Sequence, residues 1–528
     1  MLLMVLVESS AEQREFLRAA RAGTPLSYWA SRRPEATAVV AGAQRRTFAQ
    51  LDQQADRIAR ALRARGHRAG DGIAALLANR PDSVAVLAAA QRIGARLTPI
   101  NWHLNPEEVR YIVADCEART LVADSRFAPA ALLAATVPAV AARLAIGGAI
   151  PGFDDLGAAA AAESPDPVDD PRPGTTMLYT SGTTGRPKGV VKPPRHVGPA
   201  AMTGDGDWPG APSPRIVAGR SLSLVTGPLY HAAPLFFSLT HPMTAGAGAV
   251  LMERFDAREA LRLIDVHRIT HSHMVPTMFR RMLTLPPEVR ARFDVSSLVH
   301  VWHGAAACPV ADKQAMIDWW GPVLVEYYSS TEGPATYVGS EEWLRKPGTV
   351  GRPVPAELVR ILDADGRPVA PGAVGTIWIR TSPDRRFSYY RDPEKTARTY
   401  QDDYFTLGDI GRLDDDGYLF LTDRSADLII SGGVNIYPAE VEAVLAAHHA
   451  VGDVAVVGVP DAEWGERVLA VVEPVPDVAA GPELAAELIA YCRARIAHFK
   501  CPRHVEFADL ERTQTGKLPK NAIRERYR

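Results

Sequence analysis

Two hydrophobic periods alternate along the first part of the chain. Residues 47–66 place apolar side chains three and four positions apart, the spacing of one helix face, and begin at a threonine that can cap a helix. Residues 72–79 form a short, almost wholly apolar run, typical of a buried strand. Because such alternation builds parallel sheets, we expect a doubly wound α/β layer. It continues with a helix over 83–95, a strand over 96–101, a helix over 106–116 and a strand over 120–125.

The same alternation returns after residue 220, so we expect a second α/β layer of similar size. Its predicted strands are 222–228, 248–253, 269–275 and 298–304, with a helix of period 3.6 over 256–267.

The pattern changes after about residue 347. Short β runs over 358–380 surround an Asp–Gly turn, and residues 404–424 repeat this arrangement around the sequence DDDG, so both segments predict hairpins. Calcium binding at DDDG is disfavoured, because the remaining loop ligands of an EF-hand are missing. We therefore expect a small β-rich subdomain here.

The last hundred or so residues predict a small α+β domain. A short buried strand over 428–430 precedes a helix over 439–448 that starts at a proline. Strands over 453–459 and 467–474 and a helix over 482–497 follow. We predict domains at 1–423 and 424–528, with a hinge over 424–427.

The amino-acid composition limits the classes of protein to which the chain can belong. The 528 residues are 47% hydrophobic and 23% charged, as in an average soluble globular protein. With 59 Lys and Arg against 61 Asp and Glu, the net charge of −2 argues against nucleic-acid partners or an anionic membrane. Four cysteines without a CxxC pair argue against a disulfide framework or a zinc site and favour a reducing cytoplasm.

Two apolar segments need a separate interpretation. The N-terminal run MLLMVLV lacks a basic flank and is too short to span a membrane. Residues 131–150 contain Pro138 and Arg143, which favours an Ala-rich helix leading into a strand. We expect a cytoplasmic protein without stable membrane insertion.

The loop YTSGTTGRPKGVV (179–191) carries the strongest chemical signal. A strand over 177–180 leads into alternating hydroxyl and glycine residues, whose hydroxyl and backbone N–H groups can surround a phosphate. Pro187 replaces the glycine that a Walker A loop has before its lysine. We predict a phosphate-binding loop of Thr180, Ser181, Gly182, Thr183, Thr184, Gly185 and Lys188.

The sequence HSHM places His271 and His273 on one strand face. A metal site would need a third ligand, and none stands at a suitable spacing. Core or pocket histidines are the favoured interpretation.

The phosphate loop resembles the signature of the adenylate-forming superfamily, which includes acyl-CoA synthetases, peptide-synthetase adenylation domains and luciferases. Further segments resemble the family's motifs in order along almost the whole chain, and the chain is identified as a member, most similar to bacterial fatty-acyl-CoA ligases. These segments are PLYHAAP (228–234), HGAAACP (303–309), YYSSTEG (327–333), YFTLGD (404–409), DRSADLIISGGVNIYPAEVE (423–442) and RTQTGKLPK (512–520).

The resemblance implies a nucleotide site for ATP and its adenylate, with Mg²⁺. Tyr328 would stack on adenine, and Asp409 would accept hydrogen bonds from the ribose with Arg424 assisting. Glu332 would bind Mg²⁺, because carboxylate oxygens suit this hard cation. Lys517 would reach the substrate carboxylate and the α-phosphate during catalysis. Thr331 would bond phosphate, and Gly304, Ala305, Ala306 and Ser329 complete the predicted nucleotide site.

The resemblance also implies an acyl pocket and a coenzyme A path. His231, the third predicted catalytic residue beside Lys517 and Glu332, would stand where the two meet. The predicted pocket comprises Tyr230, His231, Leu235, Phe236, His303 and Gly304, and the coenzyme A contacts are Ser431, Gly432 and Gly433.

The implied activity is a two-step ligation. A carboxylic acid reacts with ATP to give acyl-AMP and pyrophosphate, the C-terminal domain rotates, and the thiol of coenzyme A then takes the acyl group. Residues 231–233 lack the acidic residue of amino-acid-activating relatives, and no carrier domain follows residue 528, which favours free coenzyme A. The small and apolar pocket residues favour a medium-to-large hydrophobic acid, polycyclic acids included.

Two departures from the family pattern keep alternatives open. Ser329 replaces a glycine, and Ser425 with Ala426 stands where the family has a polar hinge residue. A hinge without that residue could favour thioesterification of an acyl-adenylate supplied by a companion adenylating enzyme. A non-catalytic nucleotide- or acyl-binding paralogue is the remaining alternative, against which the intact Lys188, Glu332, Asp409 and Lys517 argue.

Overall fold

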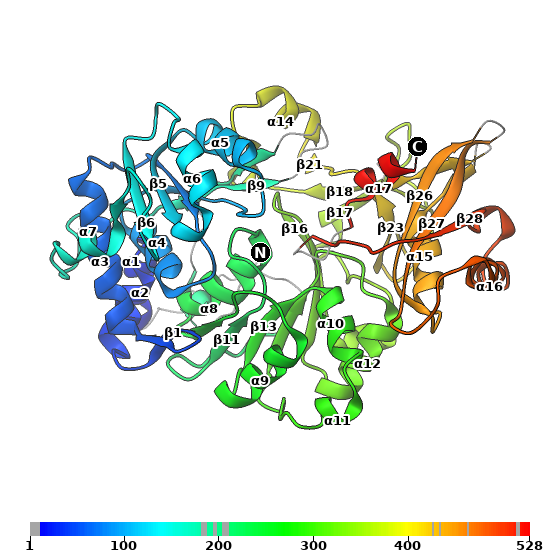
Figure 1. The fold of residues 1–528 in the computed structure, drawn as a ribbon, viewed down its shortest axis with the longest axis horizontal. Helices are drawn as coiled ribbons and strands as arrows, with labels where there is room; N and C mark the ends of the chain where they lie inside the picture. Colours follow the sequence, from blue (N-terminus) through cyan, green and yellow to red (C-terminus); the bar gives the residue numbers. More distant parts are fainter. Residues whose placement is uncertain are drawn as a thin grey trace, which may run out of the picture.

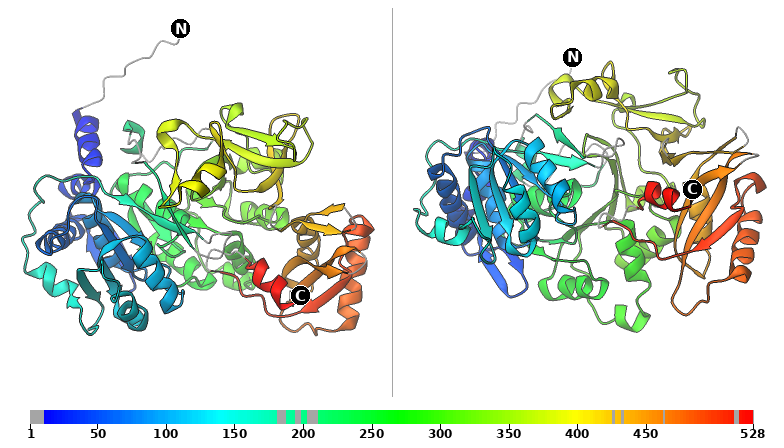
Figure 2. Two further views of the ribbon diagram at one scale, coloured as in Figure 1. Left: turned by 90° about the horizontal axis from the view of Figure 1, so that it is seen from above. Right: turned by 45° about the horizontal axis from the view of Figure 1, so that its top comes forward.

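The computed structural model describes residues 11–180, 187–193, 198–202, 211–424, 427–431, 434–461, 464–513 and 518–527. Two α/β layers and a β-rich subdomain form the larger part, and the C-terminal residues form a separate lobe beside it (Figures 1 and 2). The predicted fold class is confirmed. None of the helices in these ranges is long and apolar enough to cross a membrane.

The first α/β layer is an all-parallel sheet with the order β7-β6-β5-β3-β4-β8. Thr47 caps α3, and its hydroxyl and the Gln50 side chain form a reciprocal capping box. The apolar segment at 131–150 is the end of a helix and a strand, as predicted. The strands are β3 (Gly72–Leu76), β4 (Arg96–Pro99), β5 (Ala118–Asp124), β6 (Ala142–Ile146), β7 (Asp154–Asp155) and β8 (Thr175–Thr176). The helices are α3 (Phe48–Ala64), α4 (Pro81–Arg92), α5 (Pro106–Asp115), α6 (Ala128–Ala134) and α7 (Leu156–Ala161).

The second layer is a sheet with the order β16-β15-β14-β13-β11-β12-β1-β2, in which the two edge strands run antiparallel. Strand β1 comes from near the start of the chain and pairs in parallel with β12. The strands are β1 (Thr37–Ala41), β2 (Gln44–Thr47), β11 (Leu222–Val225), β12 (Gly248–Leu251), β13 (His271–Met274), β14 (His300–His303), β15 (Leu324–Ser329) and β16 (Pro334–Gly339). The helices are α1 (Ala11–Arg21), α2 (Pro25–Arg32), α8 (His241–Thr244), α9 (Ala257–His267), α10 (Pro276–Leu283), α11 (Pro287–Arg290), α12 (Val310–Trp320) and α13 (Ser340–Arg345), and a π-helix spans Pro234–Thr240.

The β-rich subdomain consists of two small sheets. Strands β17 and β18 pair antiparallel across the Asp–Gly turn, and β22 and β23 pair across DDDG, so both predicted hairpins are confirmed. One sheet contains β9 (Leu178–Thr180), β10 (Lys188–Val191) and β19 (Ser388–Tyr389). The other contains β17 (Val359–Leu362), β18 (Gly375–Arg380), β20 (Tyr400–Gln401), β21 (Tyr404–Phe405), β22 (Asp409–Leu413) and β23 (Leu419–Arg424), and α14 (Pro393–Thr399) lies between β19 and β20 in the chain.

The C-terminal lobe folds around one mixed sheet. The short strand expected at 428–430 is found at Ile429–Ser431, but only Ile429 is buried, whereas Ile430 is 52% exposed. The predicted strand is therefore confirmed and its burial was wrong for Ile430, because successive side chains point to opposite faces and only one face is covered. The strands are β24 (Ile429–Ser431), β25 (Val434–Ile436), β26 (Val451–Asp461), β27 (Gly465–Pro474) and β28 (His504–Phe507). The helices are α15 (Pro438–Ala446), α16 (Pro482–Arg493) and α17 (Lys520–Arg526).

Arg280 of α10 links the second layer to this lobe. Its guanidinium donates to the backbone carbonyls of Ala446 and Val451 at 3.0 and 3.1 Å. These bonds hold the end of α15 and the start of β26 against α10.

Candidate active site

A cleft of about 2880 Å³ lies where the second layer, the β-rich subdomain and the C-terminal lobe meet. The ends of the parallel strands β13, β14 and β15 face it, and in open α/β sheets ligands bind at this edge. The cleft brings together residues predicted separately along the chain: Thr180, His231, Leu235, Phe236, Ala305, Ala306, Tyr328, Ser329, Thr331, Glu332 and Asp409.

Ser330, which the sequence analysis did not single out, fixes the turn after β15 by hydrogen bonds. The hydroxyl of Ser330 accepts hydrogen bonds from the backbone N–H groups of Glu332 and Gly333, each at 3.2 Å. This turn presents Thr331 and Glu332 to the cleft.

Tyr328 and Asp409 are in direct contact. The hydroxyl of Tyr328 donates a 2.7 Å hydrogen bond to the Asp409 carboxylate. Asp409 in turn pairs with Arg424 in the register of β22 and β23. The residues expected for adenine and for ribose therefore lie side by side at one wall of the cleft.

Glu332 is buried beneath Tyr389. The Tyr389 hydroxyl donates to Oε1 of Glu332 at 3.0 Å, and burial is the main reason why the pKa of Tyr389 is raised. The ammonium group of Lys395 lies 4.3 Å from the centre of the Tyr389 ring. Sequence reasoning missed Tyr389 and Lys395, because neither stands in a motif that was singled out.

Lys188 is held by the same segment of chain. Its ammonium group lies 3.1 Å from the carboxylate of Asp392, and this hydrogen bond raises the pKa of Lys188. Asp392 also caps α14 by accepting from the backbone N–H of Lys395, the main cause of its lowered pKa. The cap signature Asp–Pro was visible in the sequence, but nothing local to it indicated a partner in the phosphate loop.

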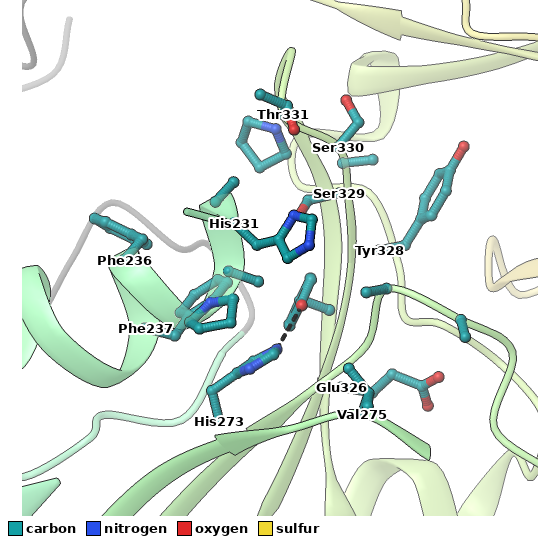
Figure 3. Close-up of a pocket in the computed structure, with 18 of the residues that line it drawn as sticks. His231, Phe236, Phe237, His273, Val275, Glu326, Tyr328, Ser329, Ser330 and Thr331 are labelled. Atoms are coloured by element: carbon teal, nitrogen blue, oxygen red, sulfur yellow. Dashed lines mark hydrogen bonds between the residues drawn. The ribbon is translucent and has the colours of Figure 1, made fainter. Parts of the chain in front are cut away.

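The side of the cleft that was predicted to hold the acyl group is aromatic. The π-helix supplies Phe236 and Phe237, whose rings lie 5.1 Å apart, and Phe237 stacks on Tyr327 at 4.6 Å. Figure 3 shows Ser330 and Thr331 at one end of this region, His231 in the middle and His273 beyond it. A bound molecule can thus extend past His231 into an aromatic pocket.

Three residues predicted for this pocket are placed beside it. His303 points to the opposite sheet face, where its ring packs 5.3 Å from Phe279, because neighbouring Trp302 faces the aromatic side. Tyr230 is buried with its ring 4.6 Å from His231. At Gly304 a Cβ would come within 2.6 Å of the Tyr327 carbonyl, so only glycine allows this close approach.

His271 and His273 share one strand face as predicted, and each ring has a hydrogen-bond partner. The Nε2 atom of His271 lies 2.7 Å from the Pro214 carbonyl, and that of His273 lies 2.7 Å from the Tyr327 hydroxyl.

Several predicted residues lie outside the described part of the chain. Ser431 is described, and it pairs with Gly465 at the end of β24. The side chain of Arg424 is not described. The residues outside are Ser181, Gly182, Thr183, Thr184, Gly185, Ser425, Ala426, Gly432, Gly433 and Lys517.

Family models match two segments of the chain. Residues 26–383 match the AMP-binding enzyme model, and residues 440–517 match the AMP-binding enzyme C-terminal domain. The chain therefore belongs to the AMP-binding enzyme family, within the adenylate-forming superfamily. Within that family it is an acid–thiol ligase of the AMP-forming, acyl-CoA synthetase type.

Characterised relatives align over nearly their whole length. The chain is 36% identical to a feruloyl-CoA synthase of Amycolatopsis sp., covering 95% of this chain and 99% of that protein. It is 35% identical to an indoleacetate–CoA ligase of Aromatoleum aromaticum (95% and 98%) and 33% identical to the fatty acid–[acyl-carrier-protein] ligase ScoC of Streptomyces coeruleorubidus (95% and 95%). The crystal structure of the anthranilate CoA ligase AuaEII with anthranoyl-AMP superposes with a TM-score of 0.83 at 25% identity, covering 96% of this chain and 97% of that one.

Proposed function

We propose that the protein activates a medium-to-large hydrophobic carboxylic acid with ATP and transfers the acyl group to coenzyme A. The observation that carries this proposal is one continuous cleft. It joins the contact between Tyr328 and Asp409 to the aromatic pocket of Phe236 and Phe237, with His231 between them.

On the nucleotide side, each residue suits one part of ATP. The Asp409 carboxylate would accept hydrogen bonds from the ribose hydroxyls, and Tyr328 would offer its ring to adenine while its hydroxyl orients Asp409. Lys188, which pairs with Asp392, would balance phosphate charge together with the hydroxyl groups of the loop.

The residues around Glu332 fit a magnesium ion. Its carboxylate is buried beside the hydroxyl-bearing Thr331, and oxygen ligands of this kind suit Mg²⁺. The ion would neutralise phosphate charge when bound. Tyr389 would fix the carboxylate by its hydrogen bond to Oε1.

The first step joins the acid to AMP. A carboxylate oxygen forms a bond to the α-phosphorus of ATP, and the bond from that phosphorus to the β-phosphate oxygen breaks, which releases pyrophosphate. Lys517 would offset the negative charge that grows on the transferring group.

The second step moves the acyl group to sulfur. The coenzyme A thiolate attacks the carbonyl carbon of the mixed anhydride, and AMP leaves with the electron pair of the broken C–O bond. His231 lies between the aromatic pocket and the phosphate side, where a thiol would meet the carbonyl. Ser431, Gly432 and Gly433 would line the route of the pantetheine arm.

Domain rotation would separate the two steps, with the hinge at 424–427 between domains 1–423 and 424–528. Strand β23 ends at Arg424 and β24 begins at Ile429, which is consistent with that boundary. The four free cysteines and the near-neutral charge support a cytoplasmic location, which fractionation of cells that express the protein would test.

The test measures the two half-reactions separately. The purified chain receives a panel of aryl and alkyl acids with ATP and Mg²⁺, and pyrophosphate is measured. A second assay supplies preformed acyl-AMP with either coenzyme A or a phosphopantetheinyl carrier protein, because one relative is named as a carrier-protein ligase.

We expect acid-dependent pyrophosphate release and thioester formation on coenzyme A, and Glu332→Gln should abolish the first. Thioester formation from acyl-AMP without pyrophosphate release from acid and ATP would identify a split ligase with a companion adenylating enzyme. No product in either assay would favour a non-catalytic binding protein.

A further inference from the structure

The floor of the aromatic pocket contains a polar pair. His273 of β13 and Tyr327 of β15 are 2% and 4% exposed, and both line the cleft. Nε2 of His273 lies 2.7 Å from the Tyr327 hydroxyl, and this bond is the dashed line in Figure 3. The pair lies beyond His231 as seen from Thr331, at the far end from the phosphate side.

This pair can form further hydrogen bonds. Burial lowers the pKa of His273 to about 3, so its imidazole is neutral, with one donor and one acceptor nitrogen. If Nε2 accepts, a lone pair of the Tyr327 oxygen remains open; if Nε2–H donates, the hydroxyl proton remains available. Among the described residues, the Tyr327 hydroxyl has no other hydrogen-bond partner.

Aromatic rings pack against His273 and Tyr327. The Phe237 ring lies 5.9 Å from the His273 ring at an interplanar angle of 13°, and 4.6 Å from Tyr327 at 30°. Tyr337 also lines the cleft and belongs to the same aromatic cluster. A planar acyl group would stack against such rings, whereas an alkyl chain would cover a polar pair without bonding to it.

We propose that His273 and Tyr327 form a recognition site for a hydrogen-bonding substituent at the far end of a planar acid, such as a ring hydroxyl, amino or keto group. Aromatic or polycyclic acids that carry such a group are then preferred over alkanoic acids of similar length. This inference rests on the proposed function, since it assigns the substrate class of the same cleft.

The test compares the kinetics of three acids that differ in ring and hydroxyl content, in the parent and in single-hydroxyl variants. The acids are 4-hydroxycinnamate, cinnamate and decanoate, and the readout is kcat and KM for thioester formation. The parent should favour 4-hydroxycinnamate over cinnamate about tenfold or more in kcat/KM, because a hydrogen-bonding site rejects an analogue without the bonding group. Decanoate should be the poorest of the three.

Tyr327→Phe should reduce this ratio to about one, chiefly by raising KM for 4-hydroxycinnamate, with cinnamate affected by less than about threefold. Tyr404→Phe removes a hydroxyl that bonds the Glu357 carbonyl outside the cleft, and it should keep the parent's ratio. A parent that prefers decanoate, or an unchanged ratio in Tyr327→Phe, would overturn the inference.

A binding measurement separates this inference from the proposed function. Calorimetry with 4-ethylphenol and ethylbenzene needs no turnover, and the parent should bind the phenol about tenfold more tightly than Tyr327→Phe does. Equal binding of the phenol by both proteins would refute the recognition site even if ligase activity is found. Discrimination without ligase activity would support the recognition site and refute the proposed reaction.

Discussion

The hydroxyl of Tyr389 donates a 3.0 Å hydrogen bond to Oε1 of Glu332, although Tyr389 lies in a sheet of the β-rich subdomain and Glu332 in the turn after β15. Tyr389 ends β19, whose neighbour β10 carries Lys188, and Lys188 is bonded to Asp392 a few residues beyond Tyr389. One short segment of the β-rich subdomain thus positions two side chains of the proposed phosphate and magnesium site.

Removing this hydroxyl should slow adenylation. Tyr389→Phe leaves the buried Glu332 carboxylate without its donor, and a hydrogen bond to a charged group contributes about 1.5–3 kcal/mol. We expect kcat for pyrophosphate release to fall about tenfold or more. Tyr400→Phe is the control, since the Tyr400 hydroxyl bonds only the Phe387 carbonyl among the interactions described. Parent-like release by Tyr389→Phe, with Glu332→Gln inactive, would show that the hydroxyl does not position Glu332.

The contact between Tyr328 and Asp409 predicts that substitution of Asp409 raises KM for ATP more than substitution of Tyr328 does. Asp409→Asn keeps the shape but loses the charge that would accept the ribose hydroxyls, so KM for ATP should rise about ten- to a hundredfold. Tyr328→Phe keeps the ring and loses the 2.7 Å bond, so its KM should rise by less, about threefold. An equal or larger effect of Tyr328→Phe would contradict this division of roles.

The ion pair of Lys313 and Glu326 should make a large contribution to stability that only a double mutant reveals. The two side chains lie 2.6 Å apart and are 0% and 6% exposed, and Lys313 also lies 4.6 Å from the centre of the Trp343 ring. Lys313→Met leaves a buried carboxylate without its partner and should lower the free energy of unfolding by about 3–5 kcal/mol in urea titrations.

Adding Glu326→Gln to Lys313→Met should restore much of the loss, because the unpaired charge is removed. Lys346→Met is a control at a more exposed site, where the ion pairs with Asp414 and Asp416 should each contribute less than about 1 kcal/mol. Equal losses in the single and double variants would mean that packing, and not charge, explains the effect.

Burial of His300 predicts a stability that depends on pH. Burial lowers its pKa to about 3, whereas an unfolded histidine has a pKa of about 6.5. Between these values the unfolded chain binds a proton that the folded chain excludes, so the free energy of unfolding rises with pH from about 3 to 6.5 and then levels off.

His300→Phe should remove part of this dependence. Between pH 7 and 5 the variant should lose about 2 kcal/mol less than the parent in urea unfolding. From pH 7 to 8, residue 300 should not change the free energy of unfolding of either protein. Identical losses at pH 5 would show that His300 is protonated in the folded chain.

The local elements and the family could be predicted from the sequence alone. Periods of 3.6 and 2 decide which side chains share a face, and Thr47 marked the start of α3. The motifs predicted Tyr328, Glu332 and Asp409, and the structure brings these three to one cleft. Periodicity, helix caps and motifs each depend on residues that are close together in the sequence, so they can be recognised without knowledge of tertiary contacts.

Which distant segments meet depends on tertiary contacts. Strand β1 completes the second sheet by pairing with β12, some two hundred residues later, and no local pattern predicts that partner. Tyr389 of the β-rich subdomain reaches Glu332 in the turn after β15. Tyr327 reaches His273 because the sheet order places β13 and β15 on either side of β14. Trp302 and His303 face opposite sides of one sheet, and what covers each side depends on helices elsewhere in the chain. Strand pairing and layer packing join segments that are far apart in the sequence. They bring the residues of the predicted motifs together around one cleft.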